Sequence, residues 1–223
     1  MYNSFKFDLG RNALRYIIQT YSIKEMKIPY YLCNVVRHTL VEEGCKPIFY
    51  HIDDKFYPVC SFNQDDYILY PNYWGVCREN VEKLIKKYPN MIIDNAHAYY
   101  DSPSGLACFN AGHKFGFKDS YAFISGAAEN LSEEIFNKEL LNARKTKFLE
   151  LHKKYKKINL LDIDENSLPF CYPCLVDTIG NADRLVQELK KEEKIIYRYW
   201  NPLPTDFNEY KFYSRLVPIP ITD

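Results

Sequence analysis

The sequence predicts an α/β protein whose main sheet is mainly parallel and carries helices on both faces. Two observations point to this class. Short apolar runs typical of strands alternate with amphipathic helical segments over residues 1–126. After Gly126 the pattern changes to a long charged helical segment, which indicates a separate, smaller α+β part. A chain of 223 residues with 47% apolar content can also bury a sizeable core.

The first region, residues 1–126, is expected to form the large domain. Helices are predicted at Leu14–Tyr21, Leu32–Glu43 and Cys77–Lys87, and strands at Met26–Pro29, Pro47–His51, Tyr67–Tyr70, Met91–Ile93, Leu106–Phe109 and Tyr121–Ile124. Gly44 is a natural stop for the second helix, because glycine readily adopts the left-handed conformation found after helix ends. Ligands of such sheets bind beyond the carboxyl ends of the strands, where Asn72 and Asp94 are expected.

The second region, residues 127–223, is predicted to contain a long helix and a small α+β C-terminal domain. The boundary is placed near residues 126–132. The predicted elements are a helix at Ser132–Tyr155 capped by Ser132, a strand at Pro169–Val176, a helix at Ala182–Lys191 and a strand at Ile195–Tyr199.

Composition narrows the class of protein. Lys+Arg and Asp+Glu both total 29, so no basic excess favours a nucleic acid as partner. No apolar run approaches the length of a membrane span, and the N-terminus does not look like a signal peptide. Seven cysteines, an odd number, fit reduced thiols. We therefore expect a cytoplasmic protein that does not bind a membrane.

The segment from Met91 to Lys114 carries the strongest chemical signal. An apolar run delivers Asp94 at its end, and Lys114 follows twenty residues later among apolar neighbours. Desolvation lowers the pKa of a lysine and frees its amine. The pair suggests a carbonyl-bearing cofactor joined to Lys114 as an imine, with its ring nitrogen paired to Asp94. The alternatives are a turn or capping role for Asp94 and a solvated surface lysine.

Two further segments could complete such a site. At Gly10–Ala13 a helix begins, and its amides together with the side chain of Asn12 could hold a phosphate; the alternative is an ordinary turn. His97 could hydrogen-bond the ring oxygen of the cofactor or orient Asp94, or it could be a structural histidine.

The remaining candidates have weaker patterns. Tyr31, beside Tyr30, could stack on a flat ring or belong to the core. Cys171 and Cys174 have the C-x-x-C spacing, but no second pair or nearby histidine completes a zinc set, so core cysteines and no metal are expected. Cys33 lacks a recognisable nucleophile elbow.

Taken together, these segments resemble the sugar aminotransferases of the DegT/DnrJ/StrS family, which are pyridoxal 5'-phosphate (PLP) enzymes of fold type I. The resemblance covers about residues 7–124 and 170–221. It rests on Leu9–Leu14 as a phosphate turn, Ile28–Cys33, Gly44–Phe49 with the following Asp53, Ile93–His97 as the Asp-x-Ala-His motif, Lys114 as the Schiff-base lysine, and Tyr197–Leu203 as the segment that returns to the active site.

The resemblance implies a PLP-dependent aminotransferase acting on a nucleotide-linked keto sugar, with glutamate or glutamine as donor. Lys114 would be the catalytic residue, and the residues that bind the cofactor would be Asn12, Ala13, Tyr31, Asp94, His97 and Lys114 itself. Arg198 would grip a substrate carboxylate, since arginine can bind one through two hydrogen bonds; otherwise it is a surface arginine. A homodimer with shared sites is expected, and the 20 Tyr and 14 Phe residues suit a broad interface.

Departures from the family pattern support a second hypothesis. No serine stands just before Lys114, where Asn110 or His113 would have to replace it, and Asp119-Ser120 stands where the family has two glycines. The chain is also shorter than family members. The alternative is therefore a shortened, non-catalytic relative that serves as a binding or interaction subunit. An unrelated nucleotide-binding domain is disfavoured by the absence of Gly-x-Gly-x-x-Gly and P-loop motifs.

Overall fold

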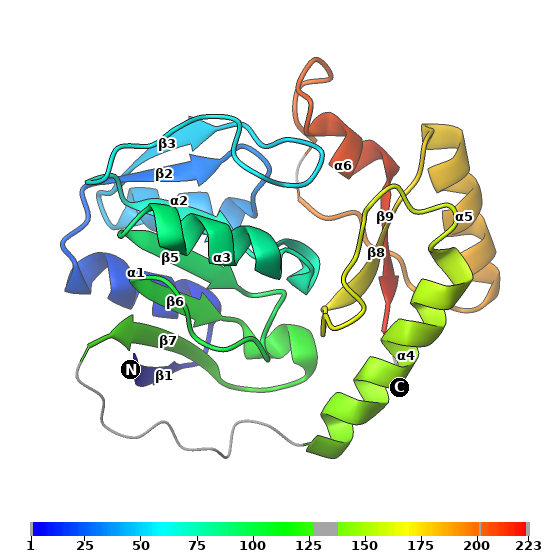
Figure 1. Cartoon of the computed structure of the whole chain (residues 1–223), viewed down its shortest axis with the longest axis horizontal. Helices are drawn as coiled ribbons and strands as arrows, with labels where there is room; N and C mark the ends of the chain where they lie inside the picture. The colour runs from blue at the N-terminus through cyan, green and yellow to red at the C-terminus, as the bar shows by residue number, and fades with distance from the viewer. Residues whose placement is uncertain (1, 127–137, 201, 222–223) are drawn as a thin grey trace.

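The computed structural model describes residues 2–126, 138–200 and 202–221. Its main feature is a seven-stranded sheet of order β1-β7-β6-β5-β4-β2-β3, followed by a two-stranded sheet of β8 and β9 (Figure 1). The strands of the large sheet are β1 Tyr2–Phe7, β2 Glu25–Pro29, β3 Lys46–Tyr50, β4 Ile68–Pro71, β5 Met91–Asn95, β6 Ala107–Asn110 and β7 Ser120–Ser125. The helices that accompany it are α1 Gly10–Thr20, α2 Asn34–Glu42 and α3 Arg78–Lys87, with short 3-10 helices η1 Tyr73–Gly75 and η2 Gly112–Phe115.

The large sheet confirms the mainly parallel prediction. Strands β3, β2, β4, β5 and β6 run parallel, and only β7 and then β1 are added antiparallel at one edge. Within this register Asp94 pairs with Pro71 on β4 and with Phe109 on β6. The carboxyl ends of three neighbouring strands therefore meet at one place.

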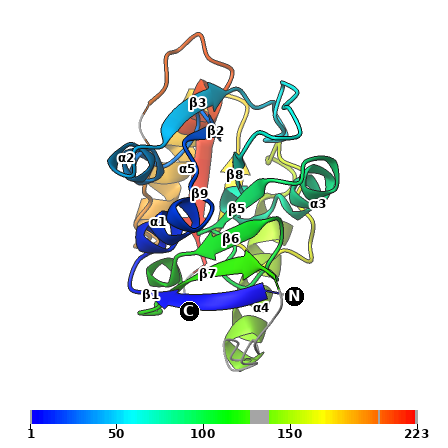
Figure 2. The ribbon, with the colours of Figure 1, turned by 90° about the vertical axis from the view of Figure 1, so that its left-hand side faces the viewer.

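Helices cover both faces of the sheet, as predicted. Figure 2 shows α1 and α2 on one side and α3 on the other. On β5, Ile92 belongs to the core under α1 and α2, whereas Met91 and Ile93 belong to the core under α3. Side chains alternate along a strand, so Asp94 points to the same face as Ile92, toward α1 and α2.

The C-terminal part builds its own small core. It contains α4 Lys138–Tyr155, β8 Cys171–Leu175, α5 Ile179–Lys191, α6 Tyr210–Arg215 and β9 Leu216–Pro220. Buried Phe148 of α4 packs against Tyr172 of β8, and Leu185 of α5 belongs to the same core. The predicted cap Ser132 and most of the proposed boundary lie outside the described residues, so the division into two domains stays a prediction.

Some expectations about secondary structure were wrong. Ile195–Tyr199 is not a strand: these residues form no ladder with a described strand, and Tyr199 packs its ring against Trp74 and His97 instead. Strands β1 and β9 and helix α6 were not predicted. Pro218 and Pro220 in β9 disfavour a strand in sequence, yet a two-stranded sheet tolerates them because both of its strands are edges.

Candidate active site

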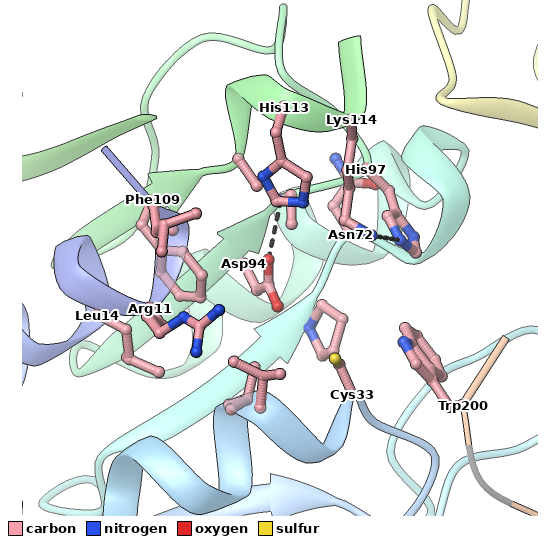
Figure 3. Close-up of a pocket in the computed structure, with 17 residues that line it drawn as sticks. Arg11, Leu14, Cys33, Asn72, Asp94, His97, Phe109, His113, Lys114 and Trp200 are labelled. Atoms are coloured by element: carbon pink, nitrogen blue, oxygen red, sulfur yellow. Dashed lines mark hydrogen bonds between the residues drawn. The ribbon is translucent and has the colours of Figure 1, made fainter. Parts of the chain in front are cut away.

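A cavity lies at the carboxyl ends of the parallel strands, between the beginnings of α1 and α2 (Figure 3). Asp94 at the end of β5, Lys114 in η2 and His97 in the turn after β5 all line it. The other lining residues are Leu9, Gly10, Arg11, Leu14, Cys33, Val35, Val36, Pro71, Asn72, Ala96, Phe109, Ala111, His113 and Trp200. The structure thus brings the predicted acid and lysine to one cavity.

Asp94 is a buried carboxylate with few partners. Its Oδ1 accepts a hydrogen bond from the amide of Ala96 at 2.8 Å, and Oδ2 has no hydrogen bond to any described residue. Burial raises the pKa of Asp94 to about 6, while the Ala96 amide and the charge of Lys114 oppose the rise. A carboxylate so placed is suited to a cationic ligand group, which would supply the missing partner.

Lys114 is presented by η2, whose tight geometry depends on Gly112. A Cβ on Gly112 would lie only 1.9 Å from the carbonyl oxygen of Asp119. The Lys114 amine lies over the rings of Phe170 and Tyr199, at 5.3 and 5.4 Å from their centroids. Burial lowers the pKa of Lys114, while the nearby Cys33 and Asp94 act in the opposite direction. The lowered pKa favours the nucleophilic free amine.

His97 is buried and in contact with Lys114, not with Asp94. Its Nε2 lies 3.2 Å from the Lys114 Nζ. Burial, and then the positive charge of Lys114, hold the pKa of His97 well below its usual value of 6.5. The imidazole is therefore neutral at physiological pH, and its ring is stacked with Phe170 and Trp200.

The start of α1 supplies the positively charged end of the cavity. Gly10 is needed there because a Cβ would meet the carbonyl oxygen of Asn110 at 3.0 Å, so the helix start packs directly on the end of β6. No side chain caps the helix among the described residues. The guanidinium of Arg11 points into the cavity (Figure 3). Amides at a helix start and a guanidinium are both suited to a phosphate.

His113 lies on the same cavity, next to Lys114. Burial and the charges of Lys114 and Arg11 lower its pKa, which shows that it shares a positive electrostatic environment. Of the two residues considered as replacements for the missing serine, only His113 lines the cavity. Asn110 instead accepts a hydrogen bond from the amide of Tyr121 through its Oδ1.

Four predicted site residues do not line the cavity. Asn12 is held by Asp8 and Arg15, and the amides of both Asn12 and Ala13 donate to the Leu9 carbonyl. The side chain of Ala13 is buried in the core under α1.

Tyr31 and Arg198 are also engaged elsewhere. The Tyr31 ring is buried in the aromatic core, stacked on Tyr73. Arg198 donates to the carbonyls of Tyr213 and Ser214 and pairs with Asp183, so it joins the end of the chain to α5.

Sequence reasoning did not select Arg11 and Trp200 as cavity residues, and it named His113 only as one of two replacements for the missing serine. Arg11 stood inside the phosphate-turn motif, so its position was available in the sequence although Asn12 was preferred. Trp200 comes from the C-terminal segment expected to return to the site, and only the folded chain shows which of its residues arrives there.

Among the described residues, no group of three or more His, Cys, Asp or Glu side chains is placed to hold a metal ion. Cys171 and Cys174 are free and buried. In the part of the chain that the structure describes, no helix is long and apolar enough to cross a membrane.

Comparison with solved structures shows which fold this is. Helicobacter pylori PseC, an aminotransferase of pseudoaminic acid biosynthesis, superposes with a TM-score of 0.71 and 15% identity over 97% of this chain and 81% of its own. A DegT/DnrJ/EryC1/StrS aminotransferase from Brucella abortus has a TM-score of 0.70 and 12% identity, over 97% of this chain and 80% of its own. The PLP form of Spr1654 from Streptococcus pneumoniae, which is named as a sugar aminotransferase, has a TM-score of 0.68 and 13% identity, over 99% of this chain and 82% of its own.

Sequence comparisons alone find no such relationship, because no protein-family model and no curated protein matches the chain. The likeness therefore lies in the arrangement of elements, and it extends over nearly the whole chain. The protein has the fold of the fold-type-I PLP-dependent aminotransferases, and its structural neighbours include a DegT/DnrJ/EryC1/StrS aminotransferase and other sugar aminotransferases.

Proposed function

We propose that the protein is a PLP-dependent aminotransferase that acts on a nucleotide-linked keto sugar with an amino-acid donor. The observation that carries the proposal is one cavity, in this fold, that is bordered by both the buried Asp94 carboxylate and the Lys114 amine. A structural neighbour, Spr1654, has been solved in a PLP form. PseC and Spr1654 are both named as enzymes of sugar chemistry, which supports a sugar as substrate class.

The residues of the cavity fit the chemical groups of PLP. Asp94, whose Oδ2 lacks a partner among the described residues, suits a protonated pyridine nitrogen. Arg11, His113 and the first amides of α1 suit the phosphate. When bound, PLP supplies an aldehyde that joins covalently to an amine and a ring that accepts electrons from the substrate.

The chain's own groups then have distinct tasks. Asp94 keeps a proton on the ring nitrogen, since an anion fixed in a buried site stabilises the cationic partner. Lys114 holds the cofactor through Nζ and afterwards carries a proton between two substrate atoms as general base and acid. Phe170, Tyr199 and Trp200 surround the amine and the imidazole beside it, and so limit the access of water.

We also propose a homodimer in a reducing cytoplasm. Val35, at the start of α2, lines the cavity and is 40% exposed, and Val41 of the same helix is 61% exposed. A partner subunit packed on this face would cover apolar surface next to the site. All seven cysteines are free, which suits a reducing compartment.

One spectrum tests the cofactor assignment. The purified protein, incubated with PLP, should gain visible absorbance, and borohydride should then fix the cofactor to the peptide that contains Lys114. Lys118, which is exposed on the same loop, is the internal control and should stay unmodified. Absence of absorbance and of a Lys114 adduct would reject the enzyme and favour the non-catalytic binding subunit.

A further inference from the structure

The environment of the Lys114 amine points to a role for His97 that neither the fold nor the cofactor assignment requires. Lys114 borders two cavities: the one that contains Asp94, and a second one lined also by Phe170, Cys171 and Tyr199. A flexible lysine side chain at such a junction can turn toward either side. A fixed hydrogen-bond acceptor beside the amine would hold it at one position.

Among the described residues, the amine has a single hydrogen-bond contact, at 3.2 Å with His97 Nε2. A neutral imidazole offers one nitrogen as acceptor, and an ammonium group can only donate. While Lys114 is protonated, the bond therefore runs from Lys114 N–H to an unprotonated Nε2, with the imidazole proton on Nδ1. When the amine loses its extra proton, a remaining N–H can keep this bond while the lone pair stays available.

The imidazole is held rigidly enough to set a direction. Its ring lies nearly parallel to those of Trp200, Phe170 and Trp74, at interplanar angles of 6°, 17° and 23° and centroid distances of 5.7, 5.4 and 5.1 Å. The three neighbouring rings restrain the plane of the imidazole, and its Nε2 edge faces Lys114 (Figure 3).

The backbone of His97 is fixed as well. Its carbonyl accepts the amide of Phe170 at 3.1 Å, and Gly75, at a φ of +79°, packs so closely that a Cβ would come within 2.5 Å of the same carbonyl oxygen. Ring plane and backbone thus both restrain the position of Nε2.

We propose that His97 is a positioning residue for Lys114, which accepts an N–H of the amine at Nε2 and thereby holds the nitrogen at the junction of the two cavities. Its importance for transamination rests on the proposed function, whereas the contact itself does not. Besides His97, the titratable groups near the amine are Cys33, Asp94, Cys171, His113 and Tyr199. The first three favour its protonated form, whereas a protonated His113 would oppose it.

Two variants separate the hydrogen bond from the stacking. His97→Phe keeps a flat ring between the aromatic neighbours but removes the acceptor, and His97→Gln offers an amide oxygen in place of Nε2. Competitive acetylation of the cofactor-free protein with acetic anhydride at a series of pH values, read by peptide mass, gives the pKa and the reactivity of Lys114. Exposed Lys118 is measured in the same samples as a control.

Loss of the acceptor should destabilise the ammonium, so His97→Phe should lower the pKa of Lys114 by about one unit. It should also slow capture of added PLP about tenfold, since the amine is no longer directed. His97→Gln should remain close to the wild type in both respects. An unchanged Lys114 pKa in His97→Phe, or equal behaviour of the two variants, would overturn the proposal.

If His97→Phe does not fold, nitrogen NMR of the wild type and of Lys114→Met decides the same question. The His97 Nε2 of the wild type should be unprotonated, and its resonance should move when Lys114 is replaced. A protonated Nε2 would overturn the proposal. If replacement of His97 changes the pKa of Lys114 in the acetylation assay but the protein takes up no PLP, the proposed function fails and the positioning role stands.

Discussion

Asp94→Asn should stabilise the cofactor-free protein at neutral pH, although it removes the group proposed to hold the cofactor. The substitution keeps an oxygen to accept the Ala96 amide at 2.8 Å and removes the buried charge. Burial raises the pKa of Asp94 from the usual 3.8 to about 6. Since one pKa unit is about 1.36 kcal/mol, ionising this carboxyl in the folded state costs about 3 kcal/mol.

The sign of the pH dependence follows from that raised pKa. Below the unfolded value of 3.8 the carboxyl is protonated in both states, and its burial as a neutral acid carries no ionisation penalty. As the pH rises toward 6 the unfolded chain ionises first, and stability is lost until the folded carboxyl ionises too. The difference between variant and wild type should therefore be small near pH 4 and reach about 3 kcal/mol near pH 7.5.

Urea unfolding of both proteins without PLP, at each pH, measures this difference. Asp183→Asn is the matched control: this carboxylate is 62% exposed and paired with Arg198, so its loss should change stability by less than about 1 kcal/mol. A variant that is less stable than the wild type at neutral pH, or a difference that does not vary with pH, would refute the picture of an undercompensated buried charge. Added PLP should stabilise the wild type more than Asp94→Asn.

Three further expectations concern the cofactor end and the lysine turn. Lys114→Ala should abolish both the visible absorbance and the borohydride adduct of the PLP-treated protein; a persistent adduct would place the attachment elsewhere. Arg11→Ala should weaken PLP binding about tenfold to a hundredfold in equilibrium titrations, because a charge-assisted hydrogen bond to the phosphate is lost. Asn12→Ala should have little effect, because Asn12 is bonded to Asp8. A larger loss in Asn12→Ala would instead favour Asn12 as the phosphate ligand. Gly112→Ala should lower the melting temperature far more than Gly116→Ala, because a Cβ on residue 112 would clash with the Asp119 carbonyl. A Cβ on residue 116 has open space, and its left-handed φ of +80° costs only about 1 kcal/mol.

The sequence predicted the parallel core of the fold well. The strands around β5 are fully buried apolar runs, and the helices between them have clear amphipathic faces, so local pattern and tertiary structure agree. The C-terminal part was harder. Ile195–Tyr199 has strand-like composition, but strand pairing depends on a free neighbouring edge, which composition does not encode.

The joint placement of Asp94 and Lys114 on one cavity could be predicted, because position along the chain determines where each side chain lies. Asp94 follows from the end of β5, and Lys114 from its distance along the chain to the next turn. The proposed phosphate-binding role of Arg11 did not follow from the sequence, because two neighbouring residues at a helix start point in different directions. Arg11 points into the cavity, whereas Asn12 turns back to Asp8. Tyr31 and Arg198 show the same limit: aromatic and cationic side chains also serve as core and as links between segments.

The walls around the Lys114 amine come from distant parts of the chain, and this has a consequence for how the protein matures. Lys114 and His97 belong to the N-terminal region over residues 2–126, whereas Phe170 and Tyr199 are added much later. During synthesis the N-terminal region leaves the ribosome first, with this lysine still hydrated and therefore fully protonated. Its amine becomes a good nucleophile only when the C-terminal part docks. We therefore expect the amine to become reactive toward aldehydes only after Phe170 and Tyr199 have packed around it.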